Sequence, residues 1–157
     1  MMRPQSPFAI VSCFLALCLS MIMFLAGASP AHAAEMVSVK QQVNMRAGAG
    51  TRHETLWKLD AGYPLQVVSR RGKWLQVRDF ERDVGWVYQP LTNRVPHHVV
   101  KVEVANIRRG PSQHTPIVGK AVYGEVLRTV ERRRHWVKVR QHDGPLGWVS
   151  RPLLWGW

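Results

Sequence analysis

The stretch WLQVRDFERDVGWVYQP, at residues 74–90, returns 62 residues later as WVKVRQHDGPLGWVSRP, at residues 136–152. In the first five residues of both copies, two aliphatic side chains alternate with a tryptophan and with polar or cationic side chains. Successive side chains of a β-strand point to opposite faces of the sheet. Residues 74–78 and 136–140 are therefore predicted to be strands that bury the aliphatic pair and turn the tryptophan to the other face.

The repeat continues on both sides of this stretch. Residues 37–91 align with residues 99–153 without a gap, and 18 of the 55 aligned pairs are identical. Short β-branched segments alternate with turn residues, and no stretch carries a 3.6-residue apolar period of helical length. The sequence therefore predicts an all-β fold made of two tandem small β barrels, one for each copy.

The repeat and the flanking composition divide the chain into five parts. Each repeat, at about 55 residues, is in the size range in which single domains fold alone. Pro96 stiffens the short polar connector between the repeats. We expect a signal peptide at residues 1–33, a first domain at 36–92, a linker at 93–98, a second domain at 99–154 and a C-terminal tail at 155–157.

Residues 1–33 have the three parts of a secretory signal peptide. Arg3 is the only charged residue before Glu35, an apolar run follows it, and Ala-His-Ala closes the segment. We predict cleavage after Ala33 and a periplasmic or secreted protein. Two alternatives stay open. The apolar run is long enough for an uncleaved anchor, since a bilayer needs about 20 residues, and this would be the protein's only membrane contact. Cys13 also ends a lipoprotein-like box, although little apolar sequence precedes it.

Cysteine and charge content limit the chemistry of the remaining chain. Both cysteines precede residue 34, so residues 34–157 have no thiol for a disulfide, a nucleophile or a thiolate metal site. The same residues keep 21 of the 22 Lys+Arg and all 10 Asp+Glu. Such an excess of positive charge favours anionic partners in a salt-dependent way. Outside the inner membrane, these are phosphorylated lipid headgroups and the carboxylates of cell-wall peptides.

No motif predicts catalysis. The six histidines of residues 34–157 form no helical pair at metal-ligand spacing, and no nucleophile motif encloses a serine. His97 and His98 are adjacent, and neighbouring side chains of an extended chain point apart. We therefore expect no enzyme activity, no metal site and no cofactor.

Three motifs occur in both copies. They are Asn-x-Arg-x-Gly at residues 44–48 and 106–110, Trp-x-x-Val at 74–77 and 136–139, and Gly-Trp-Val at 85–87 and 147–149. Together they resemble the bacterial SH3 domain family, over nearly all of residues 34–157. The tandem arrangement, with Leu-Trp-Gly near the C-terminus, is similar to small exported SH3-domain proteins of Gram-negative bacteria. The first copy departs from the family pattern, with Ala49 where the second has Pro111.

This resemblance implies strongly bent barrels of five to six strands that bind peptides or cell-wall fragments. In peptide-binding SH3 domains, an aromatic side chain at each of two strand positions lines the ligand groove, and the strand alternation here agrees with that placement. The alternative is that these rings cap the open end of a small barrel. The candidate groove residues are Trp74, Trp86, Tyr88, Trp136 and Trp148.

Cations cluster at the same predicted hairpin tip in each copy. A cationic tip beside a groove tryptophan is suited to hold a carboxylate or phosphate, because arginine makes bidentate contacts with both. The alternative is a solvated turn. The candidates are Arg70, Arg71 and Lys73 in the first copy and Arg132, Arg133 and Arg134 in the second. Asn44 and Arg46 also recur, and we interpret them as structural.

The leading hypothesis is an exported, non-catalytic binding protein that recognises peptidoglycan peptides or another envelope component. The second is a scaffold that docks an envelope enzyme or assembly. The third is a basic barrel that binds nucleic acid, which the charge and aromatic content permit. Predicted export opposes this third hypothesis, so we expect no nucleic-acid partner.

Overall fold

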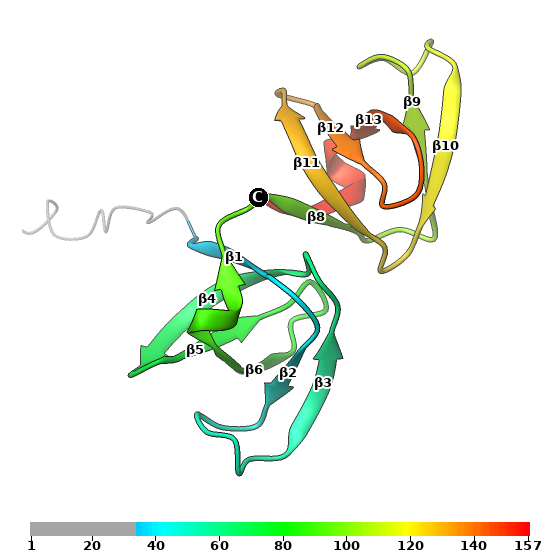
Figure 1. Cartoon of the computed structure of the whole chain (residues 1–157). Coiled ribbons are helices and arrows are strands. Elements are labelled where there is room, and N and C mark those ends of the chain that lie inside the picture. Colours follow the sequence, from blue (N-terminus) through cyan, green and yellow to red (C-terminus); the bar gives the residue numbers. More distant parts are fainter. Residues whose placement is uncertain (1–33) are drawn as a thin grey trace, which may run out of the picture. The chain divides into compact units, whose positions relative to one another are not determined.

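The computed structural model describes residues 34–157, so the predicted signal peptide and its cleavage after Ala33 lie outside the described residues. Within this range the chain forms fourteen strands and two 3₁₀ turns. The strands make two antiparallel sheets of seven strands each (Figure 1). The prediction of an all-β fold with one domain for each copy is confirmed. None of the helical segments between residues 34 and 157 is long and apolar enough to cross a membrane.

The first sheet, here named the first barrel, has the strand order β3-β2-β6-β5-β4-β1-β7. Its strands are β1 (Met36–Val39), β2 (Val43–Arg46), β3 (Thr55–Leu59), β4 (Pro64–Arg71), β5 (Trp74–Arg78), β6 (Val84–Tyr88) and β7 (Thr92–Asn93). The 3₁₀ turn η1 (Gln89–Leu91) joins β6 to β7. The family resemblance implies five or six strands, and the two-residue β7, which pairs with β1, adds the seventh.

The second sheet, here named the second barrel, has the equivalent order β10-β9-β13-β12-β11-β8-β14. Its strands are β8 (His97–Val100), β9 (Val104–Arg108), β10 (Ile117–Val122), β11 (Val126–Arg132), β12 (Trp136–Arg140), β13 (Leu146–Ser150) and β14 (Leu154–Gly156). The 3₁₀ turn η2 (Arg151–Leu153) precedes β14. The same topology in both barrels follows from the sequence duplication.

Each barrel encloses its own hydrophobic core. Leu75 and Val77 on β5 are 1% and 0% exposed, whereas Trp74 on the same strand is only partly buried. On β12, Val137 and Val139 are both fully buried. The alternation predicted for both strands is therefore confirmed. Burying an aliphatic side chain of this size stabilises a fold by about 1.5–3 kcal/mol, so these strands anchor the two cores.

The glycine of each Gly-Trp-Val motif permits a close approach between strands. A Cβ at Gly147 would lie 2.7 Å from the carbonyl oxygen of Arg108 on β9. In the first barrel, a Cβ at Gly85 would lie 3.1 Å from the carbonyl oxygen of Arg46 and 2.5 Å from Met45 Cγ. A backbone oxygen cannot move aside as a side chain can, so only glycine fits at position 147. At position 85 a Cβ would be too close to the buried Met45 side chain and tight against the oxygen. This contact explains why the residue recurs in both copies.

The first strands of the two barrels differ by one residue in register. Val37 on β1 is paired with Leu65, whereas His98 on β8 is paired with Leu127. Residues of β8 therefore correspond to residues of β1 that lie 61 positions earlier, not 62. The gap-free alignment is wrong before Val43. Strand pairing places one additional residue of the second copy between Val100, the counterpart of Val39, and Ala105, the counterpart of Val43.

Strand pairing also moves the boundary expected at the C-terminus. Trp155 is paired with Val99, and Gly156 with His98, so β14 continues into the predicted tail. His97, expected in the linker, is the first residue of β8. β14 is thus the edge strand of the second sheet, and it lies beside β8.

Candidate functional site

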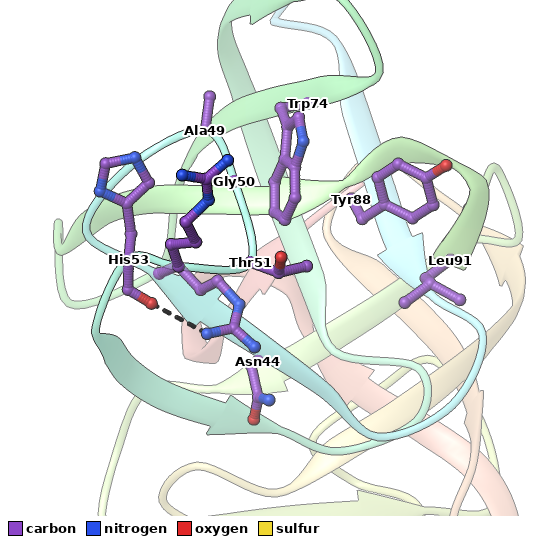
Figure 2. Close-up of a pocket in the computed structure, with 10 residues that line it drawn as sticks. Asn44, Ala49, Gly50, Thr51, His53, Trp74, Tyr88 and Leu91 are labelled. Carbon is purple, nitrogen blue, oxygen red and sulfur yellow. Dashed lines mark hydrogen bonds between the residues drawn. The ribbon is translucent and has the colours of Figure 1, made fainter.

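A groove with a volume of about 830 Å³ opens on the first barrel (Figure 2). Trp74 on β5 and Tyr88 on β6 are paired across the strands and line it. Their ring centroids are 5.4 Å apart and the ring planes are inclined by 54°. The loop between β2 and β3 supplies most of the other side. The remaining lining residues are Asn44, Arg46, Ala49, Gly50, Thr51, Arg52, His53 and Leu91.

Arg46 holds the groove loop in place. Its Nη1 donates hydrogen bonds to the carbonyl oxygen of His53, at 2.9 Å, and to Thr55 Oγ1, at 3.3 Å. In the second barrel, Arg108 Nη1 donates to the carbonyl oxygen of Thr115 at 2.9 Å. These bonds between a strand and the far end of the loop support the structural interpretation of the recurring arginine.

The equivalent groove of the second barrel is much smaller, with a volume of about 200 Å³. Trp136 lines it, but Ser150 occupies the position that Tyr88 has in the first barrel. The aromatic pair is therefore present only in the first groove. The other lining residues are Val104, Asn106, Arg108, Gln113 and Leu153.

Trp86 and Trp148 lie outside both grooves. Trp86 shares a face of β6 with Tyr88, but two residues along a strand carry it about 7 Å farther from the groove. Trp148 is 5% exposed, and cations cover it: Arg133 Cζ lies 4.6 Å and Lys138 Nζ 5.8 Å from the ring centroid. Neither ring is therefore positioned to line a groove with Trp74 or Trp136.

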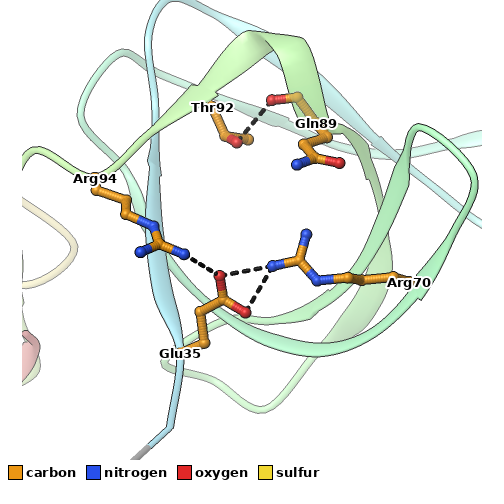
Figure 3. A network of polar contacts seen from close by, with 5 residues as sticks. All are labelled: Glu35, Arg70, Gln89, Thr92 and Arg94. Atoms are coloured by element: carbon orange, nitrogen blue, oxygen red, sulfur yellow. Dashed lines mark hydrogen bonds and ion pairs between the residues drawn. The ribbon is translucent and has the colours of Figure 1, made fainter.

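At the first basic tip, Arg70 takes part in an ion-pair network (Figure 3). Its Nη2 lies 2.6 Å from both carboxylate oxygens of Glu35, and Arg94 Nη2 lies 2.9 Å from Glu35 Oε1. The hydrogen bond from Arg70 is the main cause that holds the pKa of Glu35 below its usual value. Glu35, Arg70 and Lys73 line a cavity of about 360 Å³. Arg71 is exposed at the end of β4.

The arginines of the second basic tip have different surroundings. Arg133 stacks on Trp148, and its Nε also lies 2.8 Å from Glu131 Oε1. Arg132 is exposed at the end of β11, and Arg134 lines a separate cavity of about 330 Å³. Among residues 34–157, no acidic side chain pairs with Arg132 or Arg134.

One acidic cluster has oxygen atoms close enough together to hold a cation. Carboxylate oxygens of Asp79, Glu81 and Asp83 lie within 4.8 Å of one another. Asp79 Oδ1, however, accepts hydrogen bonds from the main-chain N–H groups of Glu81 and Asp83, at 3.0 and 2.8 Å. The buried carboxylate thus closes the turn between β5 and β6, where Arg82 has a φ of 75°. This structural role accounts for the cluster.

The comparison with protein families agrees with this fold. Residues 39–93 and 101–156 each match the family model of the bacterial SH3 domain, so the chain belongs to this family. The second match is one residue longer than the first. The bacterial SH3 domain is a binding module, and the chain contains two of them.

Similar proteins are longer than this chain. A putative N-acetylmuramoyl-L-alanine amidase, YrvJ of Bacillus subtilis (strain 168), is 21% identical over 127 residues, which are 74% of this chain and 24% of that protein. Two solved structures from Trichomonas vaginalis also match. NlpC2 is 12% identical, with a TM-score of 0.35 over 78% of this chain and 48% of its own. NlpC1 is 14% identical, with a TM-score of 0.34 over 83% and 49%. The chain thus spans about a quarter of the curated relative and about half of the solved structures.

Sequence analysis did not identify the groove loop or Glu35 as parts of these sites. The loop residues Thr51 and His53 belong to a segment without alternation, so no periodic signal marks them. Glu35 pairs with Arg70 across 35 residues and with Arg94 across 59. No local pattern signals a contact of that sequence separation.

Proposed function

We propose that this protein is an exported, non-catalytic binding protein that recognises peptidoglycan peptides or another component of the cell envelope, and that the groove of the first barrel is its principal binding site. The observation that carries the proposal is the paired Trp74 and Tyr88 rings on a groove of about 830 Å³. Ligand sites are typically concave, of this size, and lined by aromatic side chains with a few polar groups.

The lining of the first groove suits a short peptide with acidic groups. Trp74 and Tyr88 offer large apolar faces at a low cost in conformational entropy. Arg52 and His53 stand on the opposite side, and no acidic side chain is among the lining residues. Cell-wall peptides combine small apolar side chains with free carboxylates, which matches both parts of this lining. The likeness to a protein described as an N-acetylmuramoyl-L-alanine amidase supports the cell wall as the place of action.

The first test is co-sedimentation of the purified protein with peptidoglycan sacculi. Trp74→Ala is expected to weaken binding by about tenfold or more, since loss of a central aromatic anchor commonly costs at least 1.4 kcal/mol. Trp136→Ala, which changes the equivalent residue in the smaller groove, should have a much weaker effect. Circular dichroism of both variants checks that the barrels remain folded.

A matched pair of exchanges tests the role of the second ring. Tyr88→Ser copies Ser150 of the second barrel and should weaken sacculus binding, whereas Tyr88→Phe should largely retain it because the ring remains. Equal losses for Trp74→Ala and Trp136→Ala would contradict the assignment of the first groove as principal site. If the wild-type protein does not sediment with sacculi at either low or moderate salt, peptidoglycan recognition is wrong and a protein partner in the envelope replaces it.

A further inference from the structure

Each barrel has a second cavity, and the two cavities occupy equivalent places. Both lie beside the first strand of the barrel, the basic hairpin tip and the 3₁₀ turn. Lys73 in the first cavity corresponds to His135 in the second, and Gln89 corresponds to Arg151. The cavities have similar volumes, about 360 and 330 Å³. We name them the first and the second arginine pocket.

In the first arginine pocket the protein binds a carboxylate of its own (Figure 3). Glu35 points between Arg70 and Arg94, at 2.6 and 2.9 Å from their guanidinium nitrogens. Arg70 contacts both carboxylate oxygens, and hydrogen bonds between ionised groups are about twice as strong as neutral ones. This place in the fold can therefore hold a carboxylate.

The second arginine pocket has two arginines at other positions than those of the first pocket, and no acidic side chain is among its lining residues. The main chain identifies Pro96 as the counterpart of Glu35, because their carbonyl oxygens accept equivalent bonds from the N–H groups of Thr129 and Val67, at 3.0 and 2.8 Å. Arg134 and Arg151 line the pocket. Within the described part of the chain, neither arginine forms an ion pair with an acidic side chain.

The rest of this lining consists of apolar side chains and two histidines, His98 and His135. His98, at the position of Val37, is 2% exposed, and its burial lowers its pKa to about 4, so it is uncharged at neutral pH. Trp155 and Trp157 complete the pocket. The indole N–H of Trp157 is buried without a hydrogen-bond partner among residues 34–157. Buried donors normally have a partner, and this one belongs to a side chain of the pocket lining without having any.

We propose that the second arginine pocket binds the free carboxylate of a peptide ligand, in the position that the Glu35 carboxylate occupies in the first barrel. Arg134 and Arg151 contact the carboxylate, and the two indole rings contact the adjoining apolar part of the peptide. This inference rests on the proposed function and extends it. The second barrel binds the carboxylate end of a peptide, and the groove of the first barrel binds another part of a peptide. Its residues are separate from Trp74 and Tyr88, so the two proposals can fail independently.

The test is an NMR titration of the ¹⁵N-labelled protein with N-acetyl-alanyl-alanine, which has a free carboxylate, and with its C-terminal amide. The acid should shift the Trp157 indole and the His135 and Arg151 amide signals, whereas the amide should leave them in place. Inorganic phosphate is the third probe. Stronger binding of phosphate than of the peptide acid, or equal shifts with the peptide amide, would overturn the proposal.

Four variants make the test specific. Arg151→Gln, which restores the residue of the first barrel, should weaken binding of the peptide acid by at least about tenfold. Arg140 is an exposed arginine at the end of β12, outside the pocket lining. Arg140→Gln is therefore the matched control and should leave binding of the peptide acid unchanged. Pro96→Glu should abolish binding, because it supplies an internal carboxylate as Glu35 does. Unchanged binding in Arg151→Gln would contradict the assignment. The titration should be unaffected by Trp74→Ala, which separates this site from the groove.

Discussion

His98 shows how much one residue can change between two otherwise similar barrels. The equivalent residue of the first barrel is Val37, which is part of its core. Nδ1 of His98 shares a hydrogen bond of 2.6 Å with Thr129 Oγ1. Burial is the main cause that lowers the pKa of His98 to about 4, and the charges of Arg132 and Arg151 act in the same direction.

The second barrel should therefore lose stability as the pH falls from 6.5 toward 4. The folded state favours the neutral imidazole, so its contribution is complete above the unfolded pKa and decreases below it. The full difference is on the order of 3 kcal/mol, of which about 2 kcal/mol is lost between pH 7.5 and 5. Urea unfolding at these two pH values, followed by NMR signals of the second barrel, measures the loss.

The matched variant is His98→Val, which copies the first barrel. It should reduce the pH dependence of the second barrel and leave that of the first barrel as it is. A pH dependence as steep as that of the wild type would mean that other titratable groups cause it.

Ser38 is a polar residue in the buried part of β1. Its side chain is fully buried, and its hydroxyl has no hydrogen-bond partner among residues 34–157. The register places Val99, also fully buried, at the same position of β8. A buried polar group without a partner costs about 1–3 kcal/mol. The strand thus carries a cost that its counterpart avoids.

Ser38→Val should stabilise the first barrel by about 1 kcal/mol, because it removes the unpaired hydroxyl and adds buried apolar surface. Thermal unfolding of the wild type and the variant measures the change. Ser38→Ala is the control that removes the hydroxyl without adding volume. Destabilisation by both variants would show that the hydroxyl has a favourable partner, such as a bound water.

Charge is a property of the whole molecule, which has 22 Lys+Arg against 10 Asp+Glu. Attraction to any polyanion decreases as salt shortens the screening length, which is about 30 Å at 0.01 M and about 10 Å at 0.1 M. Contacts inside a groove are screened much less. Binding through the first groove and binding through general charge therefore respond differently to salt.

The ratio of sacculus binding between the wild type and Trp74→Ala should increase as salt rises from about 0.01 to about 0.1 M, because screening removes the charge attraction common to both. Co-sedimentation over this range of salt measures it. A constant ratio, with both proteins released together, would mean that charge alone binds the protein to the wall.

The strands and the duplication could be predicted from the amino-acid sequence. Leu75 and Val77 alternate with polar residues, and burial of such pairs requires a strand with one face on a core. Gly85 and Gly147 recur at the same place of the repeat, inside the Gly-Trp-Val motif. Alternation and repetition of this kind can be recognised in a single sequence without reference to the rest of the fold.

The contacts between the elements became known only from the tertiary structure. Three features differ between the two copies of the repeat or join segments that are distant in sequence. They are the one-residue shift in the register of β8, the packing of Arg133 on Trp148 and the ion pair of Arg70 with Glu35. The wide groove of the first barrel and the narrow one of the second also differ in the residue that faces the shared tryptophan, Tyr88 in the first and Ser150 in the second. Contacts of this kind depend on which side chains the folded chain brings together, and no local period encodes them.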